Sequence, residues 1–252
     1  MTFFLEALAF IADPANWAGP VGIGARLGQH LGITGLSVLL AAVVALPLGL
    51  LIGHTGRGRA LVIGVTGAAR ALPTFGMLIL FVLLGIQFGF GLSLGPVIAV
   101  LVILAIPPLL AGAYAGVEAV DRVTVDAARA QGMTEWQILT RVELPLALPL
   151  VVGGFRSATL QVVATATVAA YVAQGGLGRY LIEGLRNQDY VRAVIGALLV
   201  AALALILDGL FALVQRLVSP RGVSRGAMRT TGSTAPRPSR TRGATRTPVT
   251  EG

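Results

Sequence analysis

The chain contains no cysteine and no lysine among its 252 residues, and only two histidines, His30 and His54. Without cysteine it forms no disulfide scaffold, thiolate metal site or cysteine nucleophile. Without lysine it lacks the residue with which a Walker A loop contacts phosphates, so it is not itself a P-loop ATPase, and Schiff-base chemistry is excluded on the same ground. Two histidines leave no cluster that would hold a transition metal. We therefore expect neither catalytic residues nor a metal site in this chain.

Charged residues are also scarce, at 12% of the chain, whereas soluble proteins carry about 25%. Hydrophobic residues make up 55% of the chain, and the mean hydropathy is +0.83. This combination is typical of a protein with several membrane spans and not of a soluble enzyme. We expect an all-α membrane protein.

Long tracts without acidic residues or arginine predict the spans, because a helix needs about 20 apolar residues to cross a hydrocarbon core. The membrane domain is expected at 31–215, with five core spans at about 31–53, 71–87, 96–117, 150–173 and 192–215. The stretch 60–69 is too short to span and is interpreted as a lead-in to the second span, bent near Pro73. Small residues four apart, Gly49/Gly53 and Gly112/Gly116, suit close packing of helices.

The segments on either side of this domain are not expected to span. In the N-terminal segment 1–30, residues 2–12 are apolar but too few to cross, which favours an interfacial helix. The segment 216–252 carries eight arginines against Glu251, with few apolar residues, and predicts a disordered basic tail. The tail either attracts anionic lipid headgroups or serves as solubilising charge that fixes the topology. Nucleic-acid binding is disfavoured because the tail has no aromatic residues to stack on bases.

Arginines are distributed unevenly over the two sides of the expected spans. One side receives thirteen, the tail included, whereas the other receives only Arg26, Arg179, Arg186 and Arg192. Since cytoplasmic loops carry the excess of basic residues, we expect a multi-pass protein of the cell membrane with its N-terminus outside and its tail in the cytoplasm.

The loop between the third and fourth spans, residues 118–145, is much more polar than the spans around it. Its charges have the spacing of ion pairs on a helix, with Glu118–Arg122 and Arg122–Asp126 four apart and Asp126–Arg129 three apart. On the arginine distribution this loop lies in the cytoplasm. We therefore expect charged residues of opposite sign along one exposed helix face.

Turn and cap residues divide the same loop into two helices. Gly132 suits the end of the first, and Thr134 with Gln137 forms a capping box that starts the second. Trp136, Leu139 and Val142 give the second helix an apolar side, and Leu144-Pro145 is expected to end it. The pattern predicts a polar helix–Gly–helix hairpin, although the spacing alone fits a solvated loop with ordinary caps equally well.

The segment DAARAQGMTEWQILTRVELP resembles the EAA loop of ABC-importer permeases, in which EAA is followed after three residues by Gly and after nine more by I-x-L-P. The residues at the matching positions are Asp126, Ala127, Ala128, Gly132, Leu144 and Pro145, with Asp126 and Val142 standing where the family has Glu and Ile. The resemblance implies a five-span type I ABC-importer permease core with a cytoplasmic coupling hairpin. It also implies that the hairpin docks on a separate ATPase subunit, which binds the ATP and Mg²⁺, so that this chain needs no cofactor.

Three further stretches, Gly28–Gly53, Ala69–Leu80 and Tyr171–Leu185, resemble the quaternary-amine branch of these permeases, which transports glycine betaine, carnitine, choline or proline betaine. This resemblance implies an osmoprotectant delivered by a separate extracytoplasmic substrate-binding protein, and a second permease, either another copy or a paralogue. Two alternatives stay open: an ABC permease for another small solute such as methionine or an anion, and a secondary transporter without an ATPase. Inverted repeats, which secondary transporters often show, are not evident.

Arg156 and Asp208 are ionisable residues within or beside the fourth and fifth spans, and such residues are candidates for function. The two spans run in opposite directions, which places both residues at a similar depth. Either they form an intramembrane ion pair, or each side chain extends to the membrane interface.

Overall fold

The computed structural model describes residues 2–71, 73–89, 93–172 and 175–219, and these residues form helices joined by short turns, with no β-strand among them. The all-α expectation is confirmed. The basic tail predicted at 216–252 lies outside the described residues from 220 onward. In chain order the elements are α1 (Thr2–Ala12), the 3₁₀ helix η1 (Pro14–Trp17), α2 (Ile23–Thr55), α3 (Arg59–Ala71), α4 (Thr74–Gln87), α5 (Leu94–Glu118), α6 (Arg122–Ala130), α7 (Glu135–Ile138), the π-helical turn η2 (Leu139–Glu143), α8 (Leu144–Ala169), α9 (Gly178–Arg186) and α10 (Tyr190–Val218).

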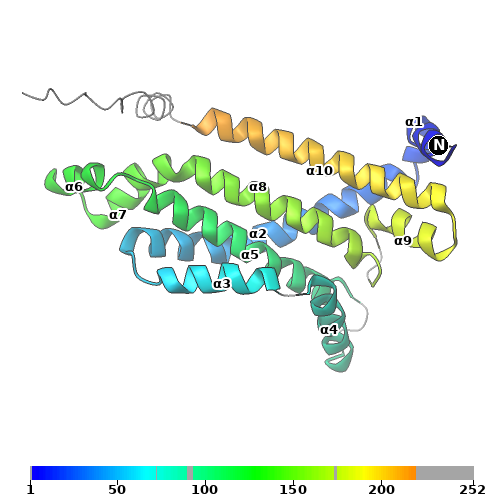
Figure 1. Cartoon of the computed structure of the whole chain (residues 1–252), viewed down its shortest axis with the longest axis horizontal. Helices are drawn as coiled ribbons and strands as arrows, with labels where there is room; N and C mark the ends of the chain where they lie inside the picture. The colour runs from blue at the N-terminus through cyan, green and yellow to red at the C-terminus, as the bar shows by residue number, and fades with distance from the viewer. Residues whose placement is uncertain (1, 72, 90–92, 173–174, 220–252) are drawn as a thin grey trace, which may run out of the picture. The chain divides into compact units, whose positions relative to one another are not determined.

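Four helical stretches are long and apolar enough to cross a membrane: α2, α5, the continuous helix that ends in α8, and α10. They occupy four of the five predicted span positions and run lengthwise side by side (Figure 1). At a rise of 1.5 Å per residue, the 25 residues of α5 extend over roughly 38 Å, more than the hydrocarbon core requires. Helices α6 and α7 lie at one end of this bundle, and α1 and α9 lie at the other (Figure 1).

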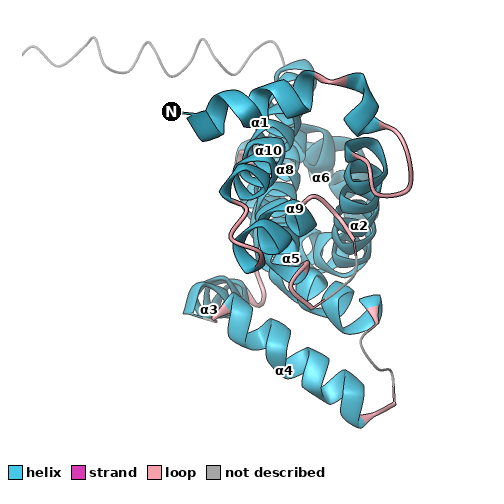
Figure 2. Cartoon of the chain, turned by 90° about the vertical axis from the view of Figure 1, so that its right-hand side faces the viewer, coloured by secondary structure: helices cyan, strands magenta, loops and turns pink. Residues whose placement is uncertain are grey.

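The second predicted span, 71–87, is not a long helix. The chain breaks at Pro73 as expected, but α3 and α4 are two separate helices of 13 and 14 residues, each shorter than a full crossing. Helix α3 lies along the bundle beside α5, whereas α4 leaves it at a steep angle (Figures 1 and 2). The predicted count of five spans is therefore not confirmed, because the interruption at Pro73 divides the apolar residues between two short helices.

Glycines bring the backbones of α2, α5 and α8 into contact, as the spacing of small residues predicts. A Cβ added to Gly49 of α2 would lie 2.7 Å from the Cβ of Ala113 in α5. One added to Gly112 of α5 would lie 2.7 Å from the Cα of Gly154 in α8. Both distances are shorter than carbon atoms tolerate, so only glycine allows this approach.

Large apolar side chains on the outside of the bundle fit contact with lipid. Leu39 and Val43 of α2 and Leu205 and Leu217 of α10 are among those most exposed. A water-soluble protein rarely exposes so many, whereas a membrane helix presents them to acyl chains. Helix α1 packs on α10, where the rings of Phe3 and Tyr190 lie 6.3 Å apart.

Candidate functional site

The polar segment between α5 and α8 forms the predicted helix–Gly–helix hairpin. The side chain of Asp121 accepts a hydrogen bond from the Val123 amide at 3.0 Å and starts α6. Gly132 turns the chain with a φ of +83°, a value that favours glycine. Thr134 and Gln137 then form the expected capping box at the start of α7.

The hairpin differs from the expectation at its second end, because Leu144-Pro145 does not stop the helix. A π-helical turn, Leu139–Glu143, follows α7 directly, and α8 continues from Leu144. Pro145 lies in the first turn of α8, directly after the π-helical turn, and its missing backbone N–H removes one hydrogen bond from a helix that nevertheless continues. The hairpin is thus joined to α8 by continuous helix, without a flexible connection.

The six residues of the EAA-like pattern lie in different surroundings. Asp126 and Ala127 are exposed on α6, and Gly132 is exposed at the turn, so these three are accessible to a partner. Ala128 is buried in the small core that the hairpin shares with Val120, Val125 and Ile138. Leu144 and Pro145 lie at the base of the hairpin, where α8 begins.

Apolar side chains are exposed on the same hairpin. Leu139 is buried and Val142 half-buried, as expected for an apolar side, but the Trp136 indole is 70% exposed. Val123 on α6 is 73% exposed. Large apolar residues on an otherwise polar surface mark contact sites for other proteins, and we name Val123, Ala127, Gly132 and Trp136 the hairpin face.

Only one of the three predicted ion pairs on this segment is present in the described residues. Asp126 accepts from Arg129 at 2.9 Å, and Arg129 also holds Glu135 of α7 with two bonds of 2.8 and 2.9 Å. The Glu118–Arg122 pair does not form, because the helix of Glu118 ends at that residue and Glu118 contacts Arg59 instead, at 3.1 Å. Arg122 and Asp126 share α6, but Asp126 pairs with Arg129 instead. The hydrogen bonds from Arg129 lower the pKa of Glu135, and burial opposes this only in part.

A histidine that sequence reasoning did not single out connects the hairpin to α2. Nδ1 of His54 lies 2.5 Å from Oε2 of Glu143, and its Nε2 lies 3.2 Å from Oε2 of Glu135. No local pattern predicts this contact, because 89 residues separate His54 from Glu143.

Arg156 and Asp208 lie in contact across α8 and α10. Nε of Arg156 donates to Oδ1 of Asp208 at 2.6 Å, and Nη2 donates to Oδ2 at 2.7 Å. The two side chains are about a third exposed, at 35% and 33%. Farther along, the Gln215 amide donates to the carbonyl oxygen of Pro149 at 2.9 Å, a second polar contact between the same helices.

A row of small and polar residues follows one face of α8, with Gly153, Ser157, Gln161 and Thr165 spaced four apart. Ser157 is exposed and the other three are partly exposed. A hollow of about 510 Å³ opens beside Gly153, Ser157 and Gln161. Residues of α3 and α5 also line it, and Leu150 is its one large aliphatic lining residue in the described part of the chain. Polar side chains on a membrane helix face water or a protein partner, because lipid tails offer them no hydrogen bond. We name Gly153, Ser157, Gln161 and Thr165 the α8 polar row.

The opposite end of the bundle holds a cluster of arginines around one acid. Glu183 of α9 accepts from Arg179 and from Arg192, each at 2.8 Å, and Arg26 of α2 approaches it at 3.9 Å. The guanidinium groups of Arg26 and Arg192 lie over the ring of Tyr180, at 5.1 and 5.7 Å. Three guanidinium groups thus gather around one carboxylate, while Glu6, Asp13 and Asp189 add further negative charge at the same end of the bundle.

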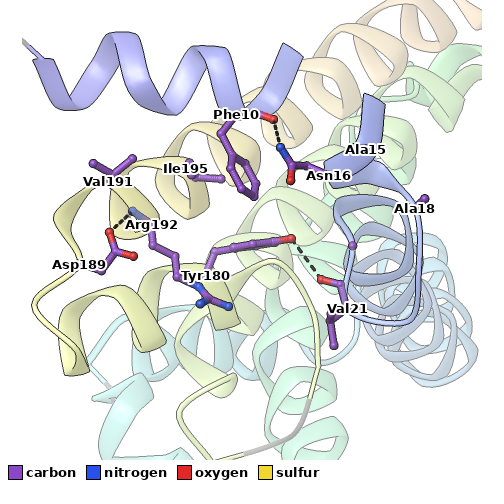
Figure 3. A pocket seen from close by; sticks show the side chains of 11 residues that line it. Phe10, Ala15, Asn16, Ala18, Val21, Tyr180, Asp189, Val191, Arg192 and Ile195 are labelled. Atoms are coloured by element: carbon purple, nitrogen blue, oxygen red, sulfur yellow. Dashed lines mark hydrogen bonds between the residues drawn. The ribbon is translucent and has the colours of Figure 1, made fainter. Parts of the chain in front are cut away.

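A pocket of about 360 Å³ opens beside that cluster, between η1, α9 and α10 (Figure 3). Its lining is mostly apolar, with the ring of Phe10 above Tyr180, and the Tyr180 hydroxyl donates to the Val21 carbonyl at 3.2 Å. Asp189 accepts from the amide of Arg192 at 3.0 Å at the pocket's rim. The pocket thus combines aromatic walls with a charged edge.

Residues 45–220 match the protein family described as "Binding-protein-dependent transport system inner membrane component". The chain is 32% identical over 198 residues to the glycine betaine/carnitine/choline transport system permease protein OpuCB of Bacillus subtilis, a match that covers 79% of this chain and 89% of that protein. It is 33% identical over 222 residues to the osmoprotectant import permease protein OsmW of Salmonella typhimurium, covering 87% and 100%. Among solved structures, the MetNI methionine ABC transporter matches with a TM-score of 0.67 at 20% identity, covering 77% of this chain and 95% of that one.

Proposed function

Since the chain belongs to the family of binding-protein-dependent transport system inner membrane components, we propose that it moves a quaternary ammonium osmoprotectant, such as glycine betaine, carnitine or choline, across the membrane. It is a permease subunit of an ABC importer and a multi-pass protein of the cell membrane. It is not an enzyme, since hydrolysis of ATP belongs to a separate ATPase subunit. Its family works with an ATPase and a substrate-binding protein.

The substrate proposal depends on one observation, the similarity to several permeases whose names state these solutes. These matches reach 30% identity or more, and in OsmW they extend over the whole relative. The likeness to the methionine transporter is at 20% identity and bears on the fold alone. A quaternary ammonium group has no N–H to donate, so neutral oxygens and aromatic faces are suited to it, and the α8 polar row is neutral.

The hairpin face is proposed as the surface that the ATPase subunit grips. Asp126, Ala127 and Gly132 are exposed there together with Val123 and Trp136. Small residues let a partner approach closely, and the two large ones supply apolar contact area. Ala128, Leu144 and Pro145 take a supporting role, since they hold the hairpin's shape and its junction with α8. This assignment requires the hairpin in the cytoplasm and α9 outside.

The α8 polar row is proposed to line the path of the solute, closed on its open side by a second permease. Either a second copy or a paralogue fits, because both would cover the polar side chains of Ser157 and Gln161, to which lipid offers no hydrogen bond. The arginine cluster at the α9 end is proposed as the docking area of the substrate-binding protein, because three guanidinium groups gather there around the single carboxylate of Glu183 and have further N–H groups to donate to acidic residues of a partner.

Residues 1–30 and 216–252 complete the proposed organisation. Residues 1–30 contain the short apolar helix α1, which fits a position at the outer membrane interface. Residues 216–252 are proposed as a cytoplasmic tail whose arginines fix the topology, with attraction to anionic lipid as the alternative.

Reconstituted transport tests the proposal. The chain is purified from its native membranes with the proteins that accompany it and is placed in vesicles with internal ATP. We expect ATP-dependent uptake of labelled glycine betaine, reduced by excess carnitine or choline but not by methionine. Preferential uptake of methionine would favour the first alternative, and uptake without any co-purified ATPase would favour a secondary transporter. Mass spectrometry of the accompanying proteins distinguishes one permease species from two.

A further inference from the structure

The His54 side chain is enclosed between two carboxylates that come from different parts of the hairpin. Glu143 belongs to the π-helical turn before α8, and Glu135 belongs to α7. The His54 side chain is only 11% exposed and that of Glu143 only 3%, whereas Glu135 is 56% exposed. One ring therefore joins a buried group and a surface group of the same hairpin to the end of α2.

The number of protons on the His54 ring determines how many of the two carboxylates it can donate to. An ionised carboxylate only accepts, and a neutral imidazole has one N–H to donate, whereas an imidazolium has two. The ring donates to both Glu143 and Glu135 only when both nitrogens carry a proton. Within the described residues, His54 is also the one basic side chain within 4.0 Å of Glu143. A buried carboxylate without such a partner is strongly unfavourable, which holds His54 in place.

The neighbouring charges extend the connection across the hairpin. Glu135 is held by Arg129 with two bonds, and Arg129 holds Asp126 at 2.9 Å. Asp126 and Arg129 lie on α6, beside the hairpin face. The series of polar contacts from α6 through α7 to His54 therefore reaches α2 without passing through α5 or α8, the two helices to which the hairpin is covalently joined.

We propose that His54 is a positioning residue that couples the hairpin to α2, so that a displacement imposed by the ATPase moves α2 together with α5 and α8. The proposal rests on the proposed function, because it assigns a role within the same coupling. Without the bridge, the hairpin transmits force only through its covalent ends, and α2 follows less completely. ATP is then hydrolysed with less solute moved.

Solute transported per ATP hydrolysed measures this role, since a purely structural contact would change the amount of folded complex and leave the ratio unchanged. In vesicles, His54→Gln is expected to lower the ratio by at least about fivefold, the lower range of coupling between sites. The ATPase still co-purifies, because the hairpin face is intact. His54→Lys supplies a positive charge and three donors, and is expected to restore at least half of the wild-type ratio.

Glu135→Ala covers the case in which His54→Gln does not fold. It removes the exposed side of the bridge and leaves the buried pair of His54 and Glu143, so the ratio is expected to fall while the complex stays stable. Arg59→Gln is the matched control, because it breaks an exposed pair with Glu118 at the same end of the bundle without touching the hairpin. We expect the wild-type ratio from it.

Three results would overturn the proposal: more than half of the wild-type ratio in folded His54→Gln, an unchanged ratio in Glu135→Ala, or no difference between His54→Lys and His54→Gln. If instead the wild-type complex shows no ATP-dependent uptake of a quaternary amine, the proposed function fails. The wild-type measurement therefore separates the two failures.

Discussion

Arg156 of α8 and Asp208 of α10 are joined by two hydrogen bonds, of 2.6 and 2.7 Å, between residues 52 positions apart. Helix α10 has no buried residue beyond Leu203 within its described length, so its second half has little apolar packing. The ion pair lies in that half, as does the bond from Gln215 to Pro149. Polar contacts therefore hold the second half of α10 against α8, in place of a hydrophobic interface.

Charge exchange tests this pair. Arg156→Asp alone places two acids in contact, and Asp208→Arg alone places two arginines there, so each is expected to destabilise the protein. Since the side chains are about a third exposed, the loss of stability is expected to exceed that from breaking a fully exposed pair. The double exchange is expected to recover most of the melting temperature in detergent. If it melts no higher than the single variants, the pair does not stabilise α10.

Gly132→Pro tests the hairpin. Proline requires a φ near −65°, whereas Gly132 has +83°, so the turn between α6 and α7 cannot keep its shape. We expect the variant to insert in the membrane, because the spans are untouched, but to lose its association with the ATPase in co-purification. Gly132→Asn is the control, since asparagine tolerates left-handed backbone at a cost of about 1 kcal/mol. Association that survives the proline would contradict the role of the hairpin face.

Arg129 controls the ionisation of Glu135. Its hydrogen bonds lower the pKa of that carboxyl below the usual 4.5. A lowered pKa in the folded state adds stability above the unfolded pKa, and this stability disappears as the pH falls through the folded value. Arg129→Gln is therefore expected to raise the pKa of Glu135. In this variant the hairpin is expected to lose its stability at a higher pH than in the wild type as the pH is lowered. Carbon NMR of labelled glutamate measures the first effect, and limited proteolysis measures the second; no change in either would contradict the contact.

The α8 polar row predicts where water enters the membrane domain. The native chain has no cysteine, so Ser157→Cys and Gln161→Cys each introduce a single thiol. Thiols react as thiolates, which form in water and not in lipid. Both variants are expected to react with a membrane-impermeant thiol reagent in the assembled complex, and excess glycine betaine is expected to slow the reaction. Leu205→Cys, on the exposed apolar side of α10, is the control that stays unlabelled. Equal labelling at all three positions would contradict the proposed path.

Local pattern predicts the parts of this fold that depend on neighbouring residues. The absence of charge marks the long helices, Pro73 marks the break between α3 and α4, and Thr134 with Gln137 marks the start of α7. The paired glycines predict the close approach of α2, α5 and α8. Each of these features depends on the residues within a single helix or at its ends, so residue spacing in the sequence is enough to predict it.

Contacts between segments that are far apart in the sequence cannot be predicted from local pattern. Composition does not distinguish a 17-residue apolar span from two short helices at an angle, since both are apolar. The predicted Glu118–Arg122 pair fails because α5 ends at Glu118 and α6 begins only at Arg122, and the predicted Arg122–Asp126 pair is replaced by Arg129–Asp126 within α6. The bridge from His54 to Glu143 joins residues 89 apart, and nothing beside either residue indicates the other.

The glycine contacts of α2, α5 and α8 set how these helices respond to a pull on one end. Where backbones touch, no side chain can yield by changing rotamer, so the three helices resist sliding and pivot about these crossings, while the His54 bridge ties the end of α2 to the hairpin. Helix α8 extends over roughly 39 Å at 1.5 Å per residue, so a tilt of about five degrees at its base carries the far end through about 3 Å. A small stroke at the hairpin is thereby magnified into an opening comparable to the radius of a methylated ammonium group.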